Sequence, residues 1–285
     1  KVQLKSAARG KVVYNAESHI NAGQCMLHPK RIDDQALRYD FIAQIAQGIR
    51  GFLFWQFRPE TLGGEAPAWG VIRPDGTERP VTHAAKEFIE KLAPYKERLM
   101  KAYAPAPKIA IWKSRKNGIY QFAAYRNLNS YADSIDSYTD ALHALNHNFA
   151  FIDHKMLTEQ DLDGVEFLIM ASPYCLTRGE ADALNQWVQD GGTVLCEAHL
   201  GAYNADRGRY SEQVPGQGLA TKWGIREVES TAAVHLPYSY GPGGHTAMLT
   251  DDVKKALSGG GGEYFLVETE SGGLTGCSRV AFLEC

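Results

Sequence analysis

The sequence predicts an α/β protein, because short apolar strands alternate with amphipathic helices along two consecutive stretches of the chain. Each predicted strand is a β-branched or aromatic run, and the helical segments between strands repeat their apolar residues every three or four positions. A segment rich in proline and alanine, residues 103–108, interrupts the alternation. We therefore expect two domains that meet at this linker.

The first stretch has the order of the last units of a (β/α)8 barrel. Residues 51–57 (GFLFWQF) are almost continuously apolar, which is typical of a strand buried on both faces. Gly10 is expected to end the first helix, and a loop over 58–70 precedes the last one. The predicted elements are a helix over 1–9, a strand over 11–15, a helix over 34–48, a strand over 51–57 and a helix over 81–102. Residues 1–103 are thus predicted to be the C-terminal part of a barrel.

The second stretch repeats the alternation over about 120 residues, which favours a doubly wound, flavodoxin-like sheet. The predicted strands cover 108–112, 149–152, 165–171 and 193–196, and the predicted helices cover 131–146 and 178–189. We assign residues 108–240 to this domain. The Gly-rich tail, residues 241–285, contains a candidate strand at 264–267 and stays unassigned, although it could be the end of the same domain.

The composition excludes several classes of function. Of the 285 residues, 44% are hydrophobic and 22% are charged, and the formal net charge is −3. Such a chain has no basic field that would attract nucleic acid or an anionic membrane. No apolar run reaches the roughly 18 residues that a bilayer span requires. We therefore expect neither a nucleic-acid partner nor a membrane segment.

The pattern of cysteine and histidine residues indicates no cofactor and no metal. The five cysteines include no CxxC pair, so neither a zinc knuckle nor a redox motif is supported. His143 and His147 are four residues apart on a predicted helix, but no third ligand accompanies them. Cys175 follows a predicted strand without the glycines of a tight nucleophile turn. The compartment stays open with the cytoplasm favoured, because a targeting segment could precede Lys1.

Two groups of motifs carry a resemblance to a known family. Residues 11–77 contain, in order, VVYNAES, AQG, FLFWQFR, GGE and GVIRPDG. This series resembles the end of the catalytic barrel in the β-galactosidases of glycoside hydrolase family 42. Residues 172–197 (SPYCLTRGEADALNQWVQDGGTVLCE) resemble that family's trimerisation domain, which has a flavodoxin-like fold related to class I amidotransferases. The resemblance implies a hydrolase of carbohydrate metabolism that assembles as a homotrimer through its second domain.

The resemblance also implies a retaining mechanism, in which terminal non-reducing β-D-galactosides are hydrolysed by double displacement. Glu17 matches the nucleophile at the tip of the seventh barrel strand, where catalytic groups of such barrels lie. Donors such as His19 or Arg58 would favour its ionised state, although His19 is expected in a loop or supporting role. The acid/base glutamate is implied on an earlier strand that no part of this chain matches. We therefore expect this fragment alone to be inactive.

The remaining candidate site residues would bind the sugar. Arg58 and Glu65 match an arginine and a glutamate of the family, and the glutamate is implied to bond galactose hydroxyls. Phe57 stands where the family usually has tryptophan. Trp55, Phe57 and Trp69 offer flat faces for the C–H face of a sugar, although packing in a buried strand would also explain Trp55 and Phe57.

Three departures from the family pattern leave the substrate open. The nucleophile motif reads Ala-Glu-Ser, Cys25 replaces an aromatic platform, and Ala68 replaces a histidine. A β-glucoside, a β-mannoside or an α-L-arabinopyranoside are therefore alternatives to a β-galactoside. A non-catalytic module for sugar binding or assembly is an alternative from another class.

Overall fold

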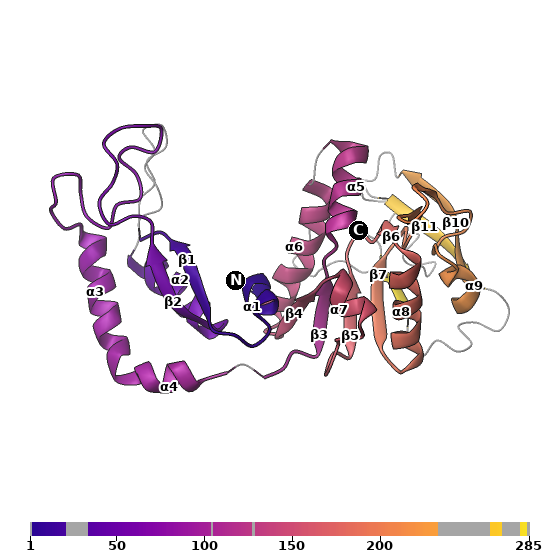
Figure 1. Cartoon of the computed structure of the whole chain (residues 1–285), viewed down its shortest axis with the longest axis horizontal. Coiled ribbons are helices and arrows are strands. Elements are labelled where there is room, and N and C mark those ends of the chain that lie inside the picture. The colour runs from indigo at the N-terminus through magenta and orange to yellow at the C-terminus, as the bar shows by residue number, and fades with distance from the viewer. Residues whose placement is uncertain are drawn as a thin grey trace, which may run out of the picture. The chain divides into compact units, whose positions relative to one another are not determined.

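The chain divides into two compact units, Lys1–Pro105 and Ala106–Cys285, in a computed structural model (Figure 1). The structure describes residues 2–20, 34–103, 105–126, 129–232, 263–269 and 280–283. Cys25 and most of the Gly-rich tail lie outside the described residues. The α/β fold class is confirmed, because each unit contains a parallel sheet together with helices. Within the described part, no helix is long and apolar enough to cross a membrane.

The first unit is built on a parallel pair of strands joined by a helix. Its elements are α1 (Val2–Ala8), β1 (Val13–Ser18), α2 (Asp34–Ala46), β2 (Ile49–Phe54), α3 (Pro80–Leu92), η1 (Ala93–Tyr95) and α4 (Lys96–Lys101). The predicted helices over 1–9 and 34–48 are confirmed as α1 and α2. The single long helix predicted over 81–102 is wrong. A short 3-10 turn that contains Pro94 separates α3 from α4, because proline cannot donate a backbone hydrogen bond within a helix.

The core of the first unit lies on one side of the strand pair. The Phe41 ring of α2 lies 5.2 Å from the ring of Phe52, 5.7 Å from Phe54 and 5.8 Å from Phe88, centroid to centroid. Leu37 is buried with them, whereas Ile42 on the same helix is 46% exposed, so the buried face of α2 is narrow. These contacts join α2 and α3 to β2.

The other side of β2 differs from its prediction. We expected residues 51–57 to form a strand buried on both faces, but β2 ends at Phe54 and Leu53 is 59% exposed. The β2 strand pairs with β1 alone among the described strands, so its other edge has no partner strand there. At Gly51, an added Cβ would lie 2.2 Å from the Tyr14 ring on β1, so only glycine allows this ring to cross the pair.

The second unit contains a five-stranded parallel sheet in the order β12-β7-β5-β3-β4 (Figure 1). Its strands are β3 (Ile109–Trp112), β4 (Phe149–Ile152), β5 (Phe167–Met170), β7 (Thr193–Glu197) and β12 (Val280–Leu283). Read from the β4 edge to the β12 edge, the strands are the second, first, third, fourth and fifth of this sheet in chain order. All four strands predicted by pattern are confirmed as β3, β4, β5 and β7. The Gly-rich tail supplies the fifth strand, β12, which the sequence did not predict.

Helices cover both faces of this sheet. The main core packs Leu168 and Met170 of β5 against Leu184 and Val188 of α8 (Arg178–Gln189). On the opposite face, α6 (Asn129–Ala144) packs Tyr131 and Ile135 against Ala171. The predictions of helices over 131–146 and 178–189 are confirmed, and the residues of β3, β4, β5 and β7 are buried or partly buried, as their apolar sequences predict.

Several short elements complete the second unit. The helices α5 and α7 were not predicted, and the candidate strand at 264–267 is confirmed within β11, which pairs antiparallel with β10. The remaining elements are α5 (Arg115–Tyr125), α7 (His154–Thr158), β6 (Cys175–Leu176), β8 (Tyr203–Asn204), β9 (Arg209–Tyr210), α9 (Leu219–Trp223), β10 (Ile225–Ala232) and β11 (Glu263–Thr269).

Candidate functional site

A break in strand register presents Glu17 to solvent at the C-terminal end of β1. Val13 and Asn15 are buried on one face of the strand, and regular alternation would place Glu17 on that face too. The pairing with β2 shifts between Asn15 and Ser18, so Ser18 is buried and the Glu17 side chain is 67% exposed. Glu17 thus lies within β1 and not after it, and the irregularity re-aims its carboxylate as bulges do beside active sites.

The strand beneath Glu17 is anchored by a buried polar chain. Asn15 donates from Nδ2 to Oε1 of Gln44 on α2, at 2.8 Å. Gln44 in turn donates from Nε2 to the Asp40 carboxylate, at 2.6 Å. Because both amides are buried and bonded, they fix β1 against α2 just before the register shift.

His19 connects Glu17 with two other parts of the unit. Its Nε2 lies 3.6 Å from Oε1 of Glu17, and its Nδ1 lies 3.0 Å from the carbonyl oxygen of Trp55. The imidazole also contacts the Trp69 ring, with 4.1 Å between centroids and a tilt of 39°. Glu17, Trp55 and Trp69, which the sequence singled out separately, therefore meet around His19.

Backbone hydrogen bonds bring the Trp69 segment to the end of β2. Trp55 donates its backbone N–H to Ser18, at 2.9 Å, and Gln56 donates to the carbonyl of Trp69, also at 2.9 Å. The loop closes tightly here, because a Cβ on Gly70 would lie 2.3 Å from Cδ of Pro59. The Trp69 ring is thereby held beside the C-terminal ends of both strands.

The other predicted sugar-binding residues lie outside this cluster. Arg58 donates from Nε to the carbonyl oxygen of Pro74, at 2.9 Å, so its guanidinium braces the backbone of a turn. Glu65 is exposed on the loop, and Phe57 is 69% exposed. In the part of the chain that the structure describes, no hydrogen bond or ion pair joins Arg58 or Glu65 to Glu17. Their contact with a sugar stays a prediction.

His19 is the residue whose position sequence reasoning understated. Its place two residues after Glu17 suggested only a nearby donor. Contact with the carbonyl of Trp55 and the ring of Trp69 depends on the pairing of β1 with β2 and on the closure of the loop. No local pattern in the sequence encodes either feature.

Cys175 in the second unit is unsuited to nucleophilic chemistry at neutral pH. It is buried on β6, and its backbone N–H donates to the Asn117 side chain at 2.9 Å. Burial, aided by the nearby Glu180 carboxylate, raises the pKa of the Cys175 thiol to about 11. Because only the thiolate is an effective nucleophile, the group is nearly all protonated at pH 7.

The expected placement of His143 and His147 on one helix is wrong, because α6 ends at Ala144 and His147 lies beyond it. His143 packs edge-on against the Phe149 ring, with 5.1 Å between centroids. Among the residues that the structure describes, no group of three His, Cys, Asp or Glu side chains could hold a metal. The contact with Phe149 shows that His143 packs against the protein surface.

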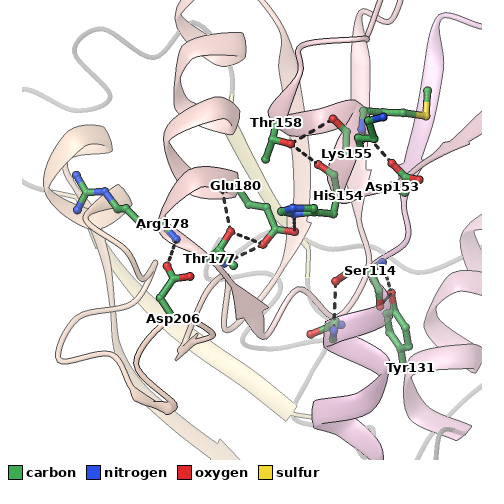
Figure 2. A network of polar contacts seen from close by, with 12 residues as sticks. Ser114, Tyr131, Asp153, His154, Lys155, Thr158, Thr177, Arg178, Glu180 and Asp206 are labelled. Carbon is green, nitrogen blue, oxygen red and sulfur yellow. Dashed lines mark hydrogen bonds and ion pairs between the residues drawn. The ribbon is translucent and has the colours of Figure 1, made fainter.

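A buried carboxylate joins α7 to α8 in the second unit (Figure 2). Thr177 caps α8, and both its backbone N–H and its hydroxyl lie 2.8 Å from Oε2 of Glu180. The other oxygen, Oε1, lies 2.8 Å from Nδ1 of His154 at the start of α7. Glu180 is fully buried, so this network stabilises the helix pair and leaves the carboxylate no access to a substrate.

Comparison with known proteins finds relatives by structure and not by sequence. No protein-family model and no curated protein matches the chain. A β-galactosidase from Bacillus circulans sp. alkalophilus superposes with a TM-score of 0.74 at 18% identity, over 94% of this chain and 38% of that chain. A catalytic mutant of a GH42 β-galactosidase from G. stearothermophilus gives a TM-score of 0.67 at 15% identity, over 90% of this chain and 35% of that chain.

The chain has the fold of these β-galactosidases. The resemblance to family 42 that the motifs suggested is thereby confirmed in structure. An exo-β-1,4-mannosidase from Opitutaceae bacterium strain TAV5 is also similar, with a TM-score of 0.52 at 16% identity, over 88% of this chain and 44% of that chain. The chain spans less than half the length of each of these three structures, and enzymes named for different sugars share its fold.

Proposed function

We propose that this chain is the C-terminal part of a retaining β-galactosidase in which Glu17 is the nucleophile. The observation that carries the proposal is the exposed Glu17 carboxylate, which the register shift turns out of the buried face at the C-terminal end of a parallel strand. Catalytic groups of (β/α)8 barrels occupy such strand ends. The fold of known β-galactosidases supports the same reading.

The reaction needs a second carboxyl group about 5–5.5 Å from the first. Glu17 would attack the anomeric carbon and form a glycosyl-enzyme, while the acid/base residue protonates the leaving oxygen and then activates water. We propose that residues outside this chain supply that acid/base. The half-exposed Trp55 and Trp69 would face the C–H face of the sugar, and Glu65, Arg58 and Phe57 would contact it further from the reacting carbon.

We further propose that the second unit is a flavodoxin-like domain that assembles three copies of the protein. The strand order, second-first-third-fourth-fifth, is the flavodoxin-like order and supports this assignment. Since β12 joins the sheet beside β7, the domain would extend from residue 108 through the Gly-rich tail. Light scattering coupled to size exclusion tests the assembly: a trimer supports it, and a monomer at micromolar concentration contradicts it.

Active-site labelling of the complete protein that carries this chain tests the catalytic proposal. A 2-deoxy-2-fluoro-β-galactosyl fluoride traps the glycosyl-enzyme of a retaining enzyme, and peptide mass spectrometry locates the adduct. We expect the adduct on Glu17, and at least a 10³-fold loss of kcat in Glu17→Gln, since the nucleophile is lost. The matched control is Glu65→Gln, which should keep the adduct on Glu17.

Three outcomes separate the alternatives. An adduct on another carboxylate with β-galactoside turnover would keep the enzyme class and reject Glu17. Turnover of a β-mannoside or β-glucoside in place of a β-galactoside would reject the sugar. No adduct and no turnover on any sugar would favour a non-catalytic module.

A further inference from the structure

We infer that His19 is a proton-gated positioning residue for Glu17, which supports the carboxylate only when its imidazole is protonated. The inference rests on the proposed role of Glu17 as nucleophile. The inference adds that His19 affects how fast the glycosyl-enzyme is hydrolysed relative to how fast it forms.

The carbonyl of Trp55 decides which tautomer His19 adopts. A carbonyl oxygen can only accept a hydrogen bond, so Nδ1 of His19, 3.0 Å away, must carry a proton and donate it. Trp55 is itself held to β1 by its N–H, which donates to Ser18 at 2.9 Å. The Trp69 ring packs against the imidazole and limits its rotation. The orientation of His19 is therefore fixed from two sides.

The fixed tautomer determines what faces Glu17. In neutral His19, Nε2 presents a lone pair to the Glu17 carboxylate 3.6 Å away, and no attraction results. In the imidazolium form, Nε2 carries a proton and donates toward the carboxylate. The separation is longer than the about 2.7–2.9 Å of a charge-assisted hydrogen bond, and such contacts often shorten when a substrate binds.

The charges around His19 leave Glu17 as its electrostatic partner among the described residues. From β1, the facing group is the Glu17 carboxylate; from the end of β2 it is the uncharged Trp55 carbonyl; from the loop it is the Trp69 ring. Arg58 turns its guanidinium to the carbonyl of Pro74. The His19 side chain is 31% exposed, so solvent reaches the imidazole.

The chemical effect falls on the second half-reaction. When water attacks the anomeric carbon, the bond between that carbon and the Glu17 oxygen breaks, and the bonding electrons return to the carboxylate. The proton of the water goes to the acid/base residue. An imidazolium at Nε2 stabilises the charge that Glu17 regains, keeps its own proton throughout, and so accelerates deglycosylation.

Two variants separate the tautomer lock from the proton gate. His19→Asn keeps a donor at the position of Nδ1, and it removes the group that faces Glu17. His19→Gln places a neutral amide near the position of Nε2, and this amide donates at every pH. The matched control is His83→Gln on α3, whose exposed imidazole lies 3.3 Å from Glu78 and far from the chemistry in sequence.

The experiment measures the complete protein with 2,4-dinitrophenyl β-D-galactoside, whose good leaving group makes deglycosylation rate-limiting. We expect His19→Asn to lower kcat about tenfold at pH 5.5 and to lower KM in parallel, because the glycosyl-enzyme accumulates and a bond to a charged group is lost. The wild-type kcat should fall as pH rises, because only the imidazolium form donates from Nε2 toward Glu17. His19→Gln should restore most of kcat and remove that fall.

Each result decides the matter. If His19→Asn matches His83→Gln in kcat, KM and pH profile while the wild type still labels on Glu17, the inference about His19 is wrong and the proposed function stands. If the wild type neither turns over nor labels on Glu17, the proposed function fails and this inference fails with it. Thermal melts of the variants verify that the fold is retained, and rescue by His19→Gln excludes a purely structural role.

Discussion

The two units of the chain bury their apolar residues to different degrees. In the second unit, helices cover both faces of the sheet, and Trp112, Leu168 and Met170 are fully buried. In the first unit, one face of β2 stays open, and most of the exposed large hydrophobic side chains of the described residues lie there, Leu53 and Trp55 among them. A doubly wound sheet thus completes its layers within one unit, whereas two β/α units do not.

Two unsatisfied polar atoms lie at the strand ends of the first unit, although the second unit also has such atoms, Trp112 Nε1 among them. Ser18 Oγ and Gln56 Nε2 are buried, and neither has a hydrogen-bond partner among the described residues. Both stand where β1 and β2 end, beside the open edges of a two-stranded sheet. Further strands of a closed barrel would cover the apolar face and remove both edges, which agrees with the proposal that this unit is the end of a longer barrel.

The largest expected effect comes from replacing one tryptophan in each unit with alanine. Trp112→Ala in the second unit should lower the free energy of unfolding by about 3–5 kcal/mol, because it empties a fully buried site. Trp55→Ala in the first unit should cost about 1 kcal/mol or less, because that side chain is already 44% exposed. Hydrogen-exchange mass spectrometry across a urea series reads the two units separately, and equal costs would contradict the contrast.

The same contrast explains which elements could be predicted from the sequence. The strands β3, β4, β5 and β7 are continuous apolar runs, as strands buried on both faces must be. The α5 helix was missed because its first turn, residues 115–118, is polar and contains Gly118, and because its start depends on Ser114, whose side chain accepts from the N–H of Asn117. The β12 strand was missed because its pairing with β7 is long-range and Gly-rich sequence precedes it.

For the candidate site, the sequence could predict the residues and not their geometry. Glu17 was recognisable because it stands at the end of a strand in a motif. Its exposure depends on a register shift that only the pairing of β1 with β2 creates. The grouping of Trp69 with His19 likewise depends on backbone hydrogen bonds between Gln56 and the end of the loop.

A stability difference of intermediate size is expected between replacing a buried glutamate of the second unit and replacing an exposed glutamate of the first. Glu180→Ala should destabilise the second unit by about 2–3 kcal/mol, because it removes a capping box, leaves two buried donors of Thr177 without their acceptor and removes the contact with His154. Glu65→Ala on the loop of the first unit should not change the free energy of unfolding measurably, since the Glu65 side chain is exposed. Chemical denaturation followed by circular dichroism compares them, and a neutral Glu180→Ala would show that the buried network is dispensable.

The smallest expected effect concerns exposed ion pairs, where the two units should behave alike. Asp182 lies 2.6 Å from the Lys222 ammonium and 2.9 Å from Arg178, and the bond to Lys222 is the main cause that lowers the pKa of this carboxyl. In the first unit, Lys91 and Arg38 likewise lower the pKa of Glu87. A lowered folded-state pKa adds stability that is present above the unfolded-state value of about 4 and is lost as pH falls through the folded-state value.

Both side chains are about half-exposed, so water and salt screen their ion pairs. Asp182→Asn should therefore cost less than about 1 kcal/mol at pH 7, and this cost should vanish near pH 2 and shrink in 1 M NaCl. Glu87→Gln should likewise lower the free energy of unfolding at pH 7, and in 1 M NaCl it should have no measurable effect. Urea midpoints at pH 7 and pH 2 measure both variants. A cost for Asp182→Asn that persists at pH 2 would show that the residue acts through packing, and the likeness between the units would then fail even at their surfaces.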